Sequence, residues 1–278
     1  MIGGVELGGT KCIVAVAHNP LDIIEKKVIS TRDPISTISD IVSFFSNFKI
    51  SGLGVGSFGP LVLNSKSDDY GLFVAESKKG WKGINIVKEF SNINSNIILE
   101  TDVNAAALGE YGYGAGKLSE TLVYVTVGTG IGVGILLEGR PHVGNFHLEI
   151  GHMLIPNSDN FRGVCEIHGN CWEGLASGPS IQTRWGIEAS KLSESHEAWE
   201  KEADLLAFGL INIISNHSPD KIIMGGGVMN QKHLFPMLRS KVGKIWNDYT
   251  PLDSLSQLIS EPGLGSDSGI VGSLSLTL

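Results

Sequence analysis

The sequence has little charge and no long apolar run. Charged residues make up 18% of its 278 residues, below the usual share of about a quarter, while its hydrophobic share of 42% is ordinary. This combination argues against intrinsic disorder. The apolar stretches, such as Leu205–Ile214, are well short of the roughly 20 residues that a bilayer span needs, so we expect no membrane helix.

Basic residues and cysteines are also scarce. The 21 Lys and Arg are outnumbered by 29 Asp and Glu, and no basic run offers a face for nucleic-acid phosphates. The three cysteines do not fit a disulfide framework, and Met1–Gly4 lacks the basic start of a secretory signal. We therefore expect a cytoplasmic protein with reduced thiols, in which Cys12 is a buried core thiol.

Glycine, in contrast, is abundant, with 36 residues, and much of it lies at turns. Two segments, Gly4–Val16 and residues 121–138, share the order strand, glycine turn, strand. This repeat predicts two halves, each with its own sheet, whose glycine turns face one another across a cleft. We place the two domains at residues 1–117 and 118–278.

Strand and helix patterns alternate along the rest of the chain, which predicts an α/β fold with mostly parallel sheets. The last predicted helix is a candidate for packing back on the first domain. The predicted helices cover residues 35–48, 105–113, 197–215 and 267–276, with a further helix starting near 179, and the predicted strands cover 53–56, 97–100 and 221–224.

The glycine turns are candidates for holding a nucleotide. A tight turn with outward N–H groups suits phosphate oxygens, and a third turn after residues 221–224 could admit an adenosine. Each turn taken alone is more simply a hairpin or a strand-to-helix connection. Together, in an α/β chain, they favour a nucleotide. The candidate residues are Gly8, Gly9, Thr10, Lys11, Gly128, Thr129, Gly130, Gly225 and Gly226.

Asp102 lies between the end of a strand and an Ala-rich helix, which is where ligands bind open α/β sheets. A carboxylate there can orient a substrate hydroxyl for attack on a phosphate. The alternative is a simple helix cap, and the local sequence favours neither reading. Asn104 is the better cap of the two, which would leave Asp102 free.

A possible metal site lies further along the chain. Cys165, His168 and Cys171, with His152 upstream, supply two thiolates and two imidazoles, a complete tetrahedral zinc set. Full coordination predicts a structural ion, because no position remains open for water. The alternative is a loop with the same residues and no metal.

Glu149 and Glu173 flank these ligands, and carboxylates and imidazoles are good partners for sugar hydroxyls. A bound zinc would fix Glu173, and His152 could meet zinc with one ring nitrogen and a hydroxyl with the other. Taken singly, each glutamate is more often a surface carboxylate. The remaining histidines, His147 among them, have no comparable partners, and we expect them at the surface or behind the site.

Several of these segments resemble motifs of the repressor/open-reading-frame/kinase (ROK) family of sugar kinases, nearly end to end. The similar segments are Glu6–Lys11, Thr101–Ala107, Val127–Gly134, His147–His152 and Cys171–Gly174. Within the family the chain is most similar to bacterial fructokinases. The segments that carry this second resemblance are Gly56–Pro60, Lys78–Trp81 and Gly174–Pro179.

The resemblance implies an actin/hexokinase-like fold of two ribonuclease-H-like domains, with ATP and Mg²⁺ in the cleft between them. It implies Asp102 as the catalytic base and a structural zinc ion on His152, Cys165, His168 and Cys171. The sugar would then lie on Gly59, Glu149, His152 and Glu173. The chain departs from the family pattern at three positions, where Glu6 replaces Asp, Thr101 replaces a common Asn, and His168 replaces Cys.

These expectations together describe an ATP-dependent hexose kinase, fructokinase-like, with a homodimer as the common assembly of the family. Three alternatives stay open. The first is a kinase for mannose, glucose or N-acetylmannosamine; the second is a sugar-sensing binding protein without catalysis. The third, an actin-like ATPase without a sugar, leaves the zinc loop unexplained.

Overall fold

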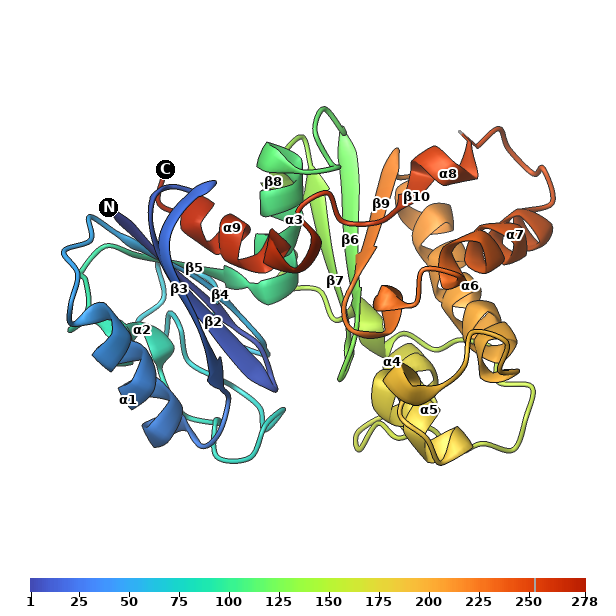
Figure 1. Cartoon of the computed structure of the whole chain (residues 1–278), viewed down its shortest axis with the longest axis horizontal. Coiled ribbons are helices and arrows are strands. Elements are labelled where there is room, and N and C mark those ends of the chain that lie inside the picture. The colour runs from blue at the N-terminus through green and yellow to red at the C-terminus, as the bar shows by residue number, and fades with distance from the viewer. Residues whose placement is uncertain (253) are drawn as a thin grey trace.

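The computed structural model describes residues 1–252 and 254–278 and contains two five-stranded sheets with two helices between them (Figure 1). The first sheet has the order β3-β2-β1-β4-β5. Its strands β1 and β2 form a hairpin around the first glycine turn, and β1, β4 and β5 are parallel. The bounds are β1 Ile2–Leu7, β2 Lys11–Asn19, β3 Asp22–Ser30, β4 Leu53–Ser57 and β5 Ile97–Thr101.

The second sheet repeats this plan in the order β10-β9-β6-β7-β8. Strands β6 and β7 form the hairpin around the second glycine turn, and β9 runs parallel to β6. Two sheets, one in each half, were predicted and are present. The bounds are β6 Thr121–Val127, β7 Ile131–Leu137, β8 Arg140–Pro141, β9 Lys221–Gly225 and β10 Ile259–Ser260.

The prediction of mostly parallel sheets is wrong. In each sheet two of the four strand pairings are antiparallel. The reason is the short turns, because a short turn can join only antiparallel strands, whereas parallel neighbours need a long crossover. The glycine turns join one antiparallel pair in each sheet, and equally short turns join β2 to β3 and β7 to β8. The crossovers are helical and follow the hairpins.

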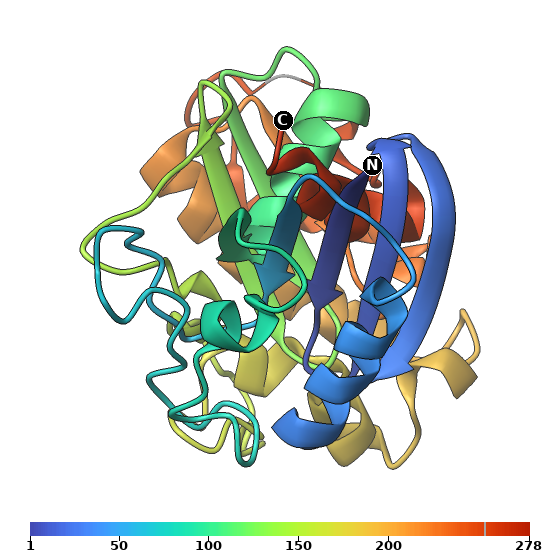
Figure 2. The same ribbon diagram turned by 90° about the vertical axis from the view of Figure 1, so that its left-hand side faces the viewer.

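The helices pack on the outer faces of the sheets and between them. Helix α1 covers the outer face of the first sheet, and α9 covers the face turned toward the second half (Figures 1 and 2). Helices α4, α5, α6 and α7 lie in the second half (Figure 1). The bounds are α1 Pro34–Phe45, α2 Ile86–Phe90, α3 Asp102–Tyr113, α4 Trp172–Ala176, α5 Gly178–Trp185, α6 Ala198–His217, α7 Leu234–Trp246, α8 Leu255–Leu258 and α9 Ser268–Ser275.

Every predicted helix is present, but several elements were not predicted, and the longest of these are helix α7 and strand β3. Helix α7 has the apolar spacing of a buried helical face, since Leu234, Phe235, Leu238 and Val242 are all buried. Strand β3 is mostly exposed and rich in Lys and Glu, so its pattern is weak.

Helices α3 and α9 touch backbone to backbone between the two sheets. A Cβ atom placed on Gly272 of α9 would lie 1.6 Å from the Ala105 carbonyl oxygen of α3, and one on Gly109 would lie 2.4 Å from the Ser268 carbonyl oxygen. These two glycines are therefore required by close approach. Helix α9 also packs on β1, β2 and β4, and α3 packs on β6 and β7, so the pair joins the two halves.

A buried carboxylate reinforces this junction. Glu110 near the end of α3 is fully buried, and its Oε1 accepts hydrogen bonds from the Ser268 hydroxyl at 2.6 Å and the Leu264 N–H at 2.9 Å. Its Oε2 accepts from the N–H groups of Ala115 at 2.7 Å and Gly263 at 2.9 Å. Glu110 thus connects the end of α3 to the segment that leads into α9.

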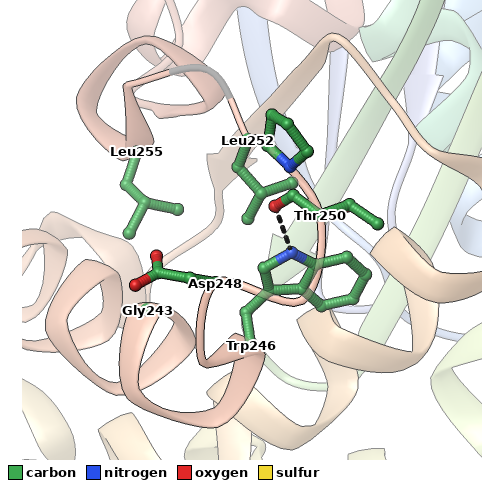
Figure 3. Close-up of a pocket in the computed structure, with 7 residues that line it drawn as sticks. Gly243, Trp246, Asp248, Thr250, Leu252 and Leu255 are labelled. Carbon is green, nitrogen blue, oxygen red and sulfur yellow. Dashed lines mark hydrogen bonds between the residues drawn. The ribbon is translucent and has the colours of Figure 1, made fainter.

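A hollow of about 390 Å³ opens beside α7 and α8 (Figure 3). The Trp246 indole N–H in its wall donates to the Thr250 carbonyl oxygen at 3.0 Å. Its lining residues include none of the predicted site residues.

Among the helices of residues 1–252 and 254–278, none combines the length and the apolar character that crossing a membrane requires.

Candidate active site

The three glycine turns come together where the two halves meet. The Thr10 hydroxyl of the first turn lies 3.0 Å from the Thr129 hydroxyl of the second. The second turn also lies beside the third, because a Cβ on Gly128 would be 3.8 Å from the Gly227 nitrogen. The two repeated turns therefore face one another, as the sequence repeat predicts.

The first glycine of each repeated turn closes its own turn. The Gly8 N–H donates to the Lys11 carbonyl oxygen at 3.1 Å, and the Gly128 N–H donates to the Gly130 carbonyl oxygen at 2.8 Å. These two N–H groups already donate within their own turns, so they are not available to bind phosphate oxygens. Gly9 lies at the open tip, where an added Cβ would meet nothing within 4 Å.

Gly226 in the third turn is required by its backbone conformation. Its φ is +93°, and a Cβ there would lie 2.4 Å from the Val127 carbonyl oxygen at the end of β6. A larger residue would be strained and would push the third turn away from the second.

Asp102 is the first residue of α3, and its carboxylate is largely unpaired. Its Oδ1 accepts the Val103 N–H at 2.9 Å, and Oδ2 has no hydrogen bond within the described ranges. Burial raises the pKa of Asp102 to about 6, against the lowering effect of that hydrogen bond. A carboxylate with such a pKa is ionised at neutral pH and is a stronger base than an ordinary aspartate.

The prediction that Asn104 caps this helix is wrong. The N-cap is Thr101, whose hydroxyl oxygen accepts the Asn104 N–H at 3.2 Å. Asn104 is buried in the first turn, and its amide donates to Glu100 Oε1 at 3.0 Å. Helix capping thus uses the residue before Asp102, and Asp102 is still left free.

The charge of Asp102 acts on two other carboxylates, Glu6 and Glu149. Burial and the charge of Asp102 raise the pKa of Glu6 to about 7, while Lys11 lowers it, and Glu6 Oε2 is buried without a hydrogen-bond partner. Burial, Glu173 and Asp102 raise the pKa of Glu149 to about 7. Asp102 therefore lies within electrostatic reach of both the first glycine turn and the loop that carries Glu149. Such mutual repulsion favours binding of a cation or of hydroxyl donors.

The four predicted metal ligands converge. Their ligand atoms all lie within 4.8 Å of one another, with His152 Nδ1 3.7 Å from Cys165 Sγ and 3.5 Å from Cys171 Sγ, and His168 Nδ1 3.8 Å from Cys165 Sγ. A tetrahedral zinc ion would hold sulfur and nitrogen about 3.6 Å apart. The cluster therefore has the composition and the spacing of a structural zinc site.

Backbone N–H groups support both thiols. The His168 N–H donates to Cys165 Sγ and the Gly174 N–H donates to Cys171 Sγ, each at 3.4 Å. Burial nevertheless raises the pKa of the Cys171 thiol to about 11. A cation that binds thiolates would offset this cost, so the donor set fits zinc.

Glu149, His152 and Glu173 surround the same loop. His152 turns Nδ1 toward the thiols, which leaves Nε2 on the other side, 4.0 Å from Glu149 Oε2. Glu173 lies on α4, and its Oε2 accepts the Ile131 N–H at 3.0 Å. The loop with the candidate metal ligands is thereby tied to the strand that leaves the second glycine turn.

The sequence analysis gave His147 no partner and expected it at the surface or behind the site, and the structure buries it beside Glu149. The His147 side chain is 3% exposed, its Nε2 accepts the Leu61 N–H at 3.1 Å, and its Nδ1 lies 3.4 Å from Glu149 Oε1. A neutral imidazole with its proton on Nδ1 fits both contacts, and burial lowers the pKa of His147. Its ring also packs on Gly59, where a Cβ would lie 2.8 Å from the ring. The signals in the sequence were its position two residues before Glu149 and its place at the start of the ROK-like segment His147–His152.

Comparison with known proteins decides the family. The model of the ROK family matches residues 2–278. The chain belongs to the ROK family. A Bacillus subtilis (strain 168) relative, named provisionally as a fructokinase, is 42% identical over 99% of this chain and 95% of its own. The fructokinase of Pediococcus pentosaceus is 34% identical over 99% of this chain and 97% of its own.

A solved structure supports the ROK fold. The ROK family glucokinase of Streptomyces griseus, in complex with glucose and AMPPNP, matches with a TM-score of 0.82 at 21% identity, covering 99% of this chain and 98% of that one. The expected actin-like, two-sheet architecture is confirmed, as is the resemblance to fructokinases within the ROK family.

Proposed function

We propose that this ROK-family sugar kinase transfers the γ-phosphate of ATP to a hexose, and that fructose is its substrate, giving fructose 6-phosphate. The observation that carries this proposal is the position of Asp102. Its free carboxylate lies at the start of α3, within electrostatic reach of Glu6 beside the first glycine turn and of Glu149 on the metal-binding loop. The fructokinase relatives, similar over almost the whole chain, support fructose as the sugar.

The nucleotide would lie along the three glycine turns. Gly9, Thr10 and Lys11 offer an open backbone tip, a hydroxyl and a cation, and Thr129 adds a second hydroxyl from the other half. The third turn, at Gly225 and Gly226, would admit the adenosine. Mg²⁺ bound with the nucleotide would neutralise phosphate charge, and the unpartnered Glu6 Oε2 fits a contact with its hydration shell.

The sugar would lie on Gly59, Glu149, His152 and Glu173. Asp102 accepts the proton of the sugar 6-hydroxyl as that oxygen attacks the γ-phosphorus. The new O–P bond forms while the bond from phosphorus to the β–γ bridging oxygen breaks, and ADP leaves. Closure of the proposed domains, residues 1–117 and 118–278, would exclude water from the reacting groups.

Zinc on His152, Cys165, His168 and Cys171 would act structurally. When bound, it would hold the loop that presents Glu149, His152 and Glu173, and it would direct His152 Nε2 toward the sugar. The cytoplasmic location and the homodimer stay predictions.

The test is ADP release measured over a panel of hexoses. We expect fructose to give the highest kcat/KM and water alone to give little ADP. Higher kcat/KM with mannose, glucose or N-acetylmannosamine would replace fructose and leave the kinase proposal standing. Calorimetric binding of a hexose with no ADP release would support the sugar-sensing alternative and overturn the kinase proposal.

A further inference from the structure

A lysine from a distant loop reaches the first glycine turn. Lys78 lies between β4 and α2, and its ammonium donates to the Gly9 carbonyl oxygen at 2.7 Å across 69 positions of sequence. It is half-buried and forms no ion pair with any carboxylate of residues 1–252 and 254–278. Its contact at the turn is therefore with a neutral carbonyl group only.

The loop that carries Lys78 is well anchored. The Trp81 indole is fully buried and donates to the Arg32 carbonyl oxygen at 3.2 Å. The Glu76 carboxylate accepts the N–H groups of Gly80 at 2.6 Å and Lys82 at 3.1 Å. The backbone around Lys78 is thus fixed on both sides, by Glu76 before it and by Trp81 after it.

Ser77, the residue before Lys78, connects the same loop to the proposed sugar site. The Ser77 hydroxyl donates to the carbonyl oxygen of Gly59, the glycine against which His147 packs. Adjacent residues of one loop therefore contact Gly59 and Gly9. The loop thus connects Gly59 of the proposed sugar site with Gly9 of the proposed phosphate turn, and the transferred group must pass between these two sites.

An ammonium has three N–H donors, and the carbonyl of Gly9 uses one of them. The ammonium therefore keeps free donors and, in the described part of the chain, has no opposite charge paired with it. An arriving phosphoryl group would supply both the charge and the acceptor oxygens. Lys11, on the turn itself, is exposed, and Lys78 is a second cation at this turn that comes from a different segment of the chain.

We propose that Lys78 binds the phosphoryl group in transfer, as the γ-phosphate of the nucleotide before the reaction and as the sugar phosphate after it. The proposal rests on the proposed kinase function. It assigns a phosphate-binding residue to the loop over residues 76–82, outside the glycine turns.

The test compares Lys78→Met and Lys78→Gln with Lys79→Met, an exposed neighbour, as matched control. Calorimetry with Mg²⁺ measures the binding of ADP and of AMPPNP, a slowly hydrolysed ATP analogue, to each variant. We expect both Lys78 variants to bind AMPPNP about 10- to 100-fold more weakly and ADP within about 2-fold of the wild type, with the control unchanged. The kcat with fructose should fall along with AMPPNP affinity.

Lys78→Gln separates a charge role from a purely structural one, because its amide can still donate to the Gly9 carbonyl oxygen. If Lys78→Gln binds AMPPNP as tightly as the wild type does, the proposal is wrong, and Lys78 only holds its loop to the first glycine turn. Equal losses for ADP and AMPPNP would overturn it as well. If the wild type phosphorylates no hexose, the proposed function fails, while preferential loss of AMPPNP binding would still support Lys78 as a γ-phosphate ligand.

Discussion

The hydroxyl groups of Thr10 and Thr129, which are 119 positions apart in the sequence, lie 3.0 Å from each other. Each belongs to the hairpin turn of a different sheet, so this contact joins the two halves at the proposed phosphate site. Both side chains are exposed, and a ligand can therefore replace the hydrogen bond between them.

We expect Thr129→Val to weaken the binding of AMPPNP by about 3- to 10-fold, because it removes one hydrogen-bonding group of ordinary strength and keeps the side-chain shape. Calorimetry measures the change. Thr129→Ser, which keeps the hydroxyl, serves as the control and should bind as the wild type does. Unchanged affinity in the valine variant would place the phosphates elsewhere.

Asp102→Asn should keep sugar binding and lower kcat by about 10²- to 10⁴-fold, since the amide cannot accept the proton. In the wild type, kcat should fall as pH drops below about 6, because protonation of Asp102 removes the base. A coupled ADP assay across pH measures both effects. Near-normal turnover in the variant would exclude Asp102 as the base.

Asp102→Asn should lower kcat but raise the free energy of unfolding. The pKa of Asp102 is raised from 3.8 to about 6 on folding, so the ionised carboxylate destabilises the folded state above this range. We expect Asp102→Asn to raise the free energy of unfolding at pH 7.5 by roughly 1 kcal/mol. The gain should disappear below about pH 4, where the wild-type carboxyl is protonated in both states. Urea unfolding at the two pH values tests this, and a gain that persists at pH 3.5 would contradict it.

Cys165→Ser should remove bound zinc and raise the KM for the sugar more than the KM for ATP, because the loop that bears Glu149 and Glu173 loses its anchor. Elemental analysis should find about one zinc ion per wild-type chain. Cys12→Ala, at a buried thiol remote from the four ligands, should keep the full zinc content. A folded and fully active protein without metal would refute the structural role.

His147→Ala should raise the KM for the sugar about 10-fold and lower stability by about 2 kcal/mol, because it leaves the Leu61 N–H without its acceptor and Glu149 without its neighbour. Steady-state kinetics and thermal unfolding measure the two effects. His18→Ala, at an exposed histidine of the β2–β3 hairpin, should change neither. Wild-type sugar kinetics in His147→Ala would leave His147 with a purely structural role.

The sequence predicted features whose physical causes are local. The candidate zinc ligands Cys165, His168 and Cys171 lie within seven residues, and their spacing alone suggests one site. Helix α3 and the repeated glycine turns also follow from short patterns. These parts of the fold and site therefore agree with the structure, and the resemblance to ROK kinases extended them to the whole chain.

The features that were missed depend on contacts between distant segments. His147 is buried because Gly59 and Leu61 of the other half lie against it, and Lys78 matters because its loop folds back on Gly9. The Asn104 prediction failed because Thr101, a weaker cap in general, had the better position. Periodicity and spacing carry no signal for such long-range encounters.

The position of α9 has a consequence for biosynthesis. Helix α9 covers one face of the first sheet, and its Ile270 and Leu274 pack against Ile2 and Ile13 of that sheet. During translation the first sheet is made before the second sheet, and its cover α9 is made after the second sheet. One apolar face of the first sheet therefore stays uncovered until α9 has been made. The core of the second half contains no residue of α9, so the second half can fold before the first is complete.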